Sequence, residues 1–160
     1  RARRNAEKAG INNAEIREGR LENLPVASGT VDAVTSNCVI NLVPDKSVVF
    51  REIARVLRPG GRLVISDILL DGPLPRAVAT DLLAYVGCVA GAMPRQAYFD
   101  LVAAAGLTGV RIHKDVDYLA AGGYTFTDEL QARLDESGVR LGDLAGRVRS
   151  ITFEARKPRA

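Results

Sequence analysis

The 160-residue chain is 47 % apolar and 26 % charged, the balance of one globular domain, which excludes disordered, collagen-like and low-complexity classes. No apolar run reaches the roughly 18 residues that span a bilayer, and no charged-then-apolar leader opens the chain, so we expect a cytoplasmic protein without a membrane partner. The net charge of +3 comes from the chain ends, since residues 21–146 hold 11 basic and 15 acidic groups. With 5 % aromatic residues, no nucleic-acid partner is expected.

The first part of the chain predicts alternating helices and strands. Residues 1–9 contain good helix formers before a glycine, which is typical of the last turns of a helix. Residues 14–17 are compatible with a short strand, and residues 31–36 alternate and are rich in β-branched side chains, which favours a strand. In residues 45–57, Asp45 can cap the N-terminus and apolar residues recur on one helical face, which predicts an amphipathic helix.

The next strand carries the prediction of fold class. Pro59 and the Gly60-Gly61 pair stop the preceding helix, and residues 62–70 then form a nearly continuous apolar run. Such a run is typical of a strand whose sheet is covered on both faces. We therefore expect an α/β fold with a largely parallel sheet.

The last part of the chain continues the pattern without an internal repeat. Helical spacing covers residues 75–87 and 94–105, with a break between them that contains glycine and proline. Residues 110–113 predict a short strand, residues 128–137 an amphipathic helix, and residues 148–156 a closing strand.

Two cysteines and one histidine cannot supply four zinc ligands or a disulfide framework, so a structural metal is not expected. Taken singly, each cysteine would more often be an inert packing residue. However, Cys38 follows a predicted strand and Cys88 lies beside the Gly-rich break between two helices, which are places where side chains can face a cleft. Gly60-Gly61 is a helix stop, since no G-x-G-x-x-G follows a strand.

A strand, a helix, a Pro-Gly-Gly turn and a second strand follow one another in residues 18–67, and this stretch resembles the second half of a class I S-adenosylmethionine-dependent methyltransferase domain, a Rossmann-like α/β fold. More narrowly, NCVINLVPDK at 37–46, GCVAGA at 87–92 and VRSITFEARKP at 148–158 resemble the arsenite methyltransferases. The first two strings together are much more specific than the R-P-G-G turn. The resemblance covers nearly the whole chain and implies methyl transfer to trivalent arsenic, a detoxification reaction.

The resemblance implies four cofactor contacts. Gly19, Arg20 and Leu21 would form the loop beside the adenine of S-adenosylmethionine. Asn37, at the carboxyl end of a strand, would contact the methionine part of the cofactor, in agreement with the general placement of ligands outside the carboxyl ends of parallel strands.

Cys38 and Cys88 fall on the two arsenic-binding cysteines of the family and would be the catalytic thiols. Soft thiolates select soft centres such as trivalent arsenic, and alkyl transfer from a sulfonium needs an in-line nucleophile at close range and no general base. Trivalent arsenic or its thiol conjugates and a thiol reductant are the expected partners. Gly87 stands where some members carry Glu, which puts a role for that carboxylate in doubt.

The resemblance further predicts that residues 1–160 are the C-terminal part of such a domain, with residues 114–147 inserted before the closing strand. The Gly-rich turn and the acidic residue that hold the cofactor in the family do not occur, so this fragment alone is expected to be inactive. The family strand order 3-2-1-4-5-7-6 would leave the strand at 31–36 with an unpaired edge, through which a homodimer could form.

Two other functions remain open from the residues themselves. The chain could come from a different small-molecule methyltransferase in which both cysteines are merely buried. It could also be a non-catalytic fragment that binds a metalloid or a partner, since two thiols can hold arsenite without any cofactor site.

Overall fold

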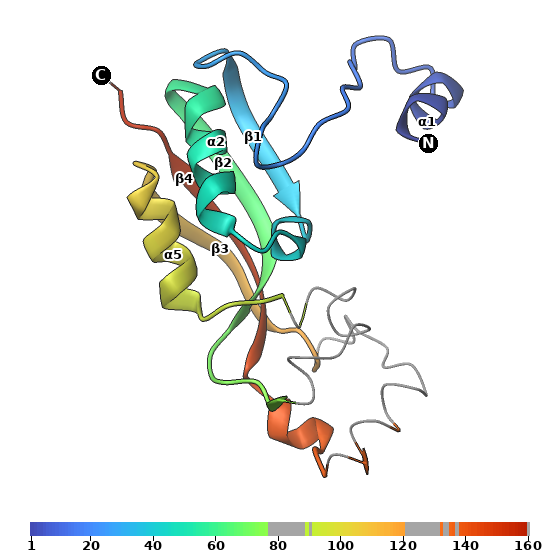
Figure 1. Cartoon of the computed structure of the whole chain (residues 1–160), viewed down its shortest axis with the longest axis vertical. Coiled ribbons are helices and arrows are strands. Elements are labelled where there is room, and N and C mark those ends of the chain that lie inside the picture. Colours follow the sequence, from blue (N-terminus) through green and yellow to red (C-terminus); the bar gives the residue numbers. More distant parts are fainter. Residues whose placement is uncertain (77–88, 90, 121–131, 133–134, 137, 160) are drawn as a thin grey trace.

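The computed structural model describes residues 1–76, 89, 91–120, 132, 135–136 and 138–159 (Figure 1). Its centre is a four-stranded sheet in the order β1-β2-β4-β3. The strands are β1 (Val31–Asn37), β2 (Leu57–Leu70), β3 (Thr108–Asp117) and β4 (Val148–Arg156). This order agrees with the last four positions, 4-5-7-6, of the order that the family resemblance implied.

The expectation of a largely parallel sheet is wrong for the described strands. β1 and β2 are parallel, but β4 runs antiparallel to β2, and β3 antiparallel to β4. The apolar run at 62–70 shows that β2 is buried on both faces near its end, and burial does not determine the direction of the neighbouring strands. Strand β2 therefore has one parallel neighbour, β1, and one antiparallel neighbour, β4.

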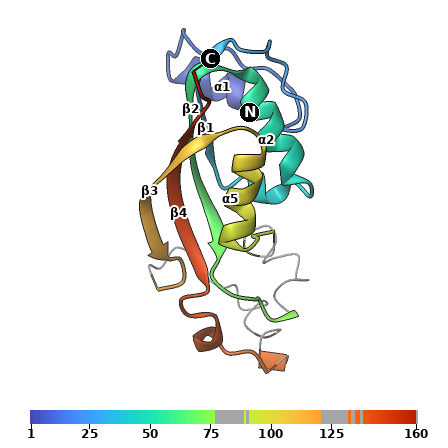
Figure 2. The same cartoon turned by 90° about the vertical axis from the view of Figure 1, so that its left-hand side faces the viewer.

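Two helices, α2 (Lys46–Val56) and α5 (Arg95–Ala104), lie on the same face of the sheet (Figure 2). Helix α2 begins where predicted, because the Asp45 carboxylate accepts a hydrogen bond from Ser47 N at 3.0 Å. Helix α1 (Ala2–Lys8) lies apart from this layer, and two short 3₁₀ helices, Ile40–Leu42 and Leu141–Leu144, complete the described elements. Among the described residues, no helix has the length and apolar character needed to cross a membrane.

The predicted elements are confirmed at 1–9, 31–36, 45–57, 94–105 and 148–156. The strand predicted at 110–113 is longer in both directions, and the strand predicted at 62–70 begins five residues earlier, at Leu57. The Pro-Gly-Gly segment therefore belongs to β2, where Gly60 takes the left-handed φ of +79° and donates its N–H to Lys157 O at 2.9 Å.

Residues 14–17, which were considered as a short strand, are not a strand in the structure. They do not pair with β1, the edge strand of the sheet. Within the described chain the outer edge of β1 has no strand partner, so pairing of two copies there stays a prediction. The helices predicted at 75–87 and 128–137 lie almost wholly outside the described residues.

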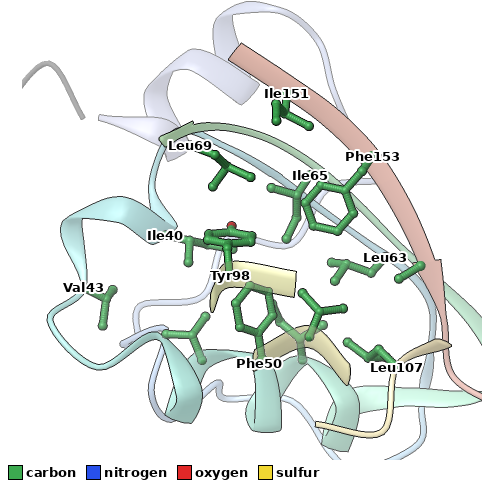
Figure 3. Packing of buried hydrophobic residues seen from close by; sticks show 14 of the residues in the cluster. Ile40, Val43, Phe50, Leu63, Ile65, Leu69, Tyr98, Leu107, Ile151 and Phe153 are labelled. Carbon is green, nitrogen blue, oxygen red and sulfur yellow. The ribbon is translucent and has the colours of Figure 1, made fainter. Parts of the chain in front are cut away.

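The main core lies between the sheet and helices α2 and α5 (Figure 3). Phe50 of α2 and Phe153 of β4 both meet the ring of Tyr98 edge to face, with centroid distances of 5.1 and 6.0 Å. A smaller buried cluster lies near the carboxyl end of β2 and consists of Ile68, Leu70, Val89, Leu144 and Val148. Since successive strand residues face opposite ways, Leu69 enters the main core while its two neighbours enter the smaller cluster.

Candidate functional site

A hollow of about 240 Å³ opens where β1 ends, beside residues 66–68 of its parallel neighbour β2. Because both strands point to the same edge of the sheet, Asn37 pairs with Ser66, and the residues that follow them lie close together. The volume is below the roughly 300 Å³ of typical small-molecule sites, so it suits a small ligand or one end of a larger one. The hollow is lined by Asn37, Cys38, Ser66, Asp67, Ile68, Tyr118 and Ser150.

Cys38 lies at the point where the chain leaves β1. Its N–H donates to Ser66 O at 2.9 Å, so the pairing with β2 continues one residue beyond the strand. Its φ of 57° is the left-handed conformation, which costs an L residue with a side chain on the order of 1–3 kcal/mol and is concentrated at functional sites. The side chain is half-buried and packs against the smaller cluster, while Asn37 remains exposed.

A buried carboxylate, Asp67, borders the same hollow and is 2 % exposed. Tyr98 donates its hydroxyl to Asp67 Oδ2 at 2.9 Å, and the N–H of Ile68 donates to Oδ1 at 3.2 Å. Burial raises the pKa of Asp67 to about 6, although these hydrogen bonds and the charge of Lys46 act in the opposite direction. The floor of the hollow therefore holds a group that can gain or lose a proton near neutral pH.

Two further buried polar residues follow β1 in the chain: Asn41, in the 3₁₀ turn, and Lys46, the first residue of α2. The ammonium of Lys46 is buried and donates to the carbonyl oxygens of Val43 and Asn41 at 3.2 and 3.4 Å. Burial lowers the pKa of Lys46, since a charged ammonium is poorly solvated there. Asn41 Nδ2 donates to Ile68 O at 2.7 Å and so ties the 3₁₀ turn after Cys38 to β2.

Sequence reasoning missed Asp67, Lys46, Asn41 and Tyr98. One signal could have found Asp67, because it is the single acidic residue inside the apolar run of β2, and a charge in a doubly covered strand needs a partner. The partner, Tyr98, is 31 residues away, and α5 must pack before the two can meet.

Gly19, Arg20 and Leu21 lie elsewhere, and none of them lines the hollow. Gly19 and Arg20 are exposed, whereas Leu21 is half-buried against the main core. A Cβ at position 19 would lie 2.6 Å from Pro25 Cδ, so this contact alone requires glycine there. The three residues thus begin a folded loop that is bonded to α2.

Cys88 and Gly87 lie outside the described residues, as does Ala90, so half of the string GCVAGA is not described. Val89, the residue after Cys88, is buried in the smaller cluster against which Cys38 packs. Over the described part of the chain, no three His, Cys, Asp or Glu side chains form a group that could hold a metal ion.

Comparisons with known proteins identify relatives for nearly the whole chain. A family model described as a methyltransferase domain matches residues 1–123. An arsenite methyltransferase of Halobacterium salinarum is 38 % identical over 153 residues, which are 96 % of this chain and 31 % of that protein. One from Aquipseudomonas alcaligenes is 39 % identical over 113 residues, or 69 % of this chain and 33 % of that protein.

The fold comparison agrees with the sequence comparison. An arsenic(III) S-adenosylmethionine methyltransferase from Chlamydomonas reinhardtii superposes with a TM-score of 0.63 at 29 % identity. The match covers 89 % of this chain and 43 % of the algal protein. The chain thus spans about a third of the length of the two curated relatives.

Proposed function

The chain belongs to the methyltransferase domain family, and we propose that its protein transfers a methyl group from S-adenosylmethionine to trivalent arsenic. Cys38 carries the proposal, because its half-buried side chain borders the hollow at the carboxyl end of β1, in a strained backbone conformation. The arsenite methyltransferases among the relatives support arsenic as the acceptor.

Cys38 and Cys88 are proposed as the arsenic ligands. Each thiol replaces a hydroxyl group on the arsenic, so that an arsenic–sulfur bond forms and water leaves. Thiolates suit this soft centre, and two of them leave its lone pair available as a nucleophile. Val89, the neighbour of Cys88 in the sequence, is buried in the smaller cluster that also contacts Cys38.

The residues of this chain fit one end of the cofactor. S-adenosylmethionine, when bound, supplies an electrophilic methyl group on its sulfonium sulfur. Asn37 presents an exposed amide beside Cys38, and we propose that it holds the methionine part. Gly19, Arg20 and Leu21 are proposed to contact the adenine. Holding arsenic and methyl donor at close range supplies most of the rate, so no acid or base from this chain is required.

The test is methyl transfer to arsenite by the full-length gene product, followed through methylated arsenic and the demethylated cofactor. Cys38→Ser and Cys88→Ser are each expected to lower the rate at least about 100-fold, since one-thiol binding misplaces the nucleophile. Ala103→Ser, on an exposed position of α5, is the matched control and should keep the wild-type rate. Absence of methylated arsenic from the wild type would contradict arsenic as the acceptor, and full activity in both cysteine variants would contradict the two thiols as its ligands.

A further inference from the structure

The loop of residues 19–28 is fastened to helix α2 by one arginine. Arg55 Nη1 donates to Val26 O at 2.9 Å and to Ser28 Oγ at 3.1 Å. Its Nη2 donates to Leu24 O at 3.1 Å. The same guanidinium therefore bonds three residues of the loop that begins with Gly19.

Glu52, one turn earlier on α2, completes the attachment. It accepts two hydrogen bonds from Arg55, at 2.8 Å each, and its Oε2 also accepts the N–H of Leu24 at 3.0 Å. Both side chains are partly buried, which limits competition from water. Arginine suits this place because its planar fork can bond a carboxylate and two carbonyl groups together, whereas lysine presents a single point charge.

Pro25 connects this attachment to Gly19. It lies between Leu24 and Val26, whose backbone groups are bonded to Glu52 and Arg55. Gly19 is in close contact with the Pro25 ring, and Arg17 Nη1 donates to Pro25 O at 2.7 Å. Asn23 N donates to Arg20 O at 3.1 Å. A shift at Leu24 or Val26 would therefore be passed directly to Gly19–Leu21.

We propose that Glu52 and Arg55 are positioning residues that hold the 19–28 loop ready for the adenine of S-adenosylmethionine. This inference rests on the proposed function, which assigns the adenine contact to Gly19–Leu21. A loop ordered before binding loses less conformational entropy when the ligand arrives, so the pair acts on cofactor affinity. Neither residue lines the hollow at Cys38, so the methyl-transfer step itself should be little affected.

The test compares Arg55→Lys and Glu52→Gln with the wild-type full-length gene product. Both variants are expected to raise the Kd and KM for S-adenosylmethionine about tenfold, the effect of roughly one charge-assisted hydrogen bond, while kcat stays within about twofold. Arg51→Lys, at an exposed position of the same helix, is the matched control and should change none of these values.

Amide hydrogen exchange of residues 22–28 in the same variants supplies a second readout that needs no activity. Faster exchange together with weaker cofactor binding supports the inference. Faster exchange with unchanged Kd and KM would overturn it, as would unchanged exchange. Failure of the proposed function looks different, because the wild type would then bind S-adenosylmethionine without methylating arsenite.

Discussion

Strand β2 places residues of opposite chemistry in equally buried positions on one face. Leu63 and Ile65 are 0 % exposed and pack in the main core between the sheet and the helices. Asp67, the next residue on that face, is 2 % exposed and meets the hydroxyl of Tyr98. Burial stabilises the fold at the first two positions, whereas a buried carboxylate costs free energy. This difference separates two positions of β2 that stabilise the core from one that borders the hollow.

The largest change in stability is expected from Ile65→Ala. The substitution leaves a cavity among tightly packed apolar side chains and should lower the free energy of unfolding by about 4 kcal/mol. Urea denaturation followed by circular dichroism measures it, with Val110→Ala on the exposed surface of β3 as control. A loss below about 1 kcal/mol would mean that burial at Ile65 does little to stabilise the fold.

Asp67→Asn should raise the free energy of unfolding, and the size of this gain should depend on pH. The pKa of Asp67 is raised from 3.8 to about 6 by burial, so the folded state holds the proton more tightly than the unfolded state does. The stabilising contribution is complete below pH 3.8 and is lost as the pH rises through about 6. A shift of about two units corresponds to about 3 kcal/mol.

The difference in unfolding free energy between Asp67→Asn and the wild type should therefore grow in favour of the variant between pH 4 and pH 7.5. Denaturation of both proteins at the two pH values measures it. If the difference is the same at both, the carboxylate is not held in the environment described, and the contrast within β2 disappears.

Much of the fold was predictable because its signals are local. The Asp45 cap, the spacing of apolar residues in α2 and the alternation in β4 each lie within one segment. The direction of β4 was not predictable from the apolar run of β2, which reports burial alone. The start of β2 at Leu57 was missed because Pro59 and two glycines usually end an element, but here they are part of a strand.

The candidate site was likewise predictable from the sequence only in part. The resemblance and the order of elements suggested Asn37 and Cys38 together at a strand end, and the structure has both at the hollow. The left-handed backbone of Cys38 and the meeting of Asp67 with Tyr98 depend on contacts between distant segments. The attachment of the 19–28 loop to Arg55 is likewise invisible in a linear pattern, because it joins backbone carbonyl groups to a side chain about 30 residues later.

Joint binding of trivalent arsenic by Cys38 and Cys88 is tested most directly by titrating the 160-residue chain with phenylarsenite. Mass spectrometry counts bound arsenic, and a thiol reagent counts the thiols that remain. We expect one arsenical per chain with both thiols consumed in the wild type, much weaker binding to Cys38→Ser and Cys88→Ser, and none to the double variant. Unchanged binding in both single variants would contradict joint binding.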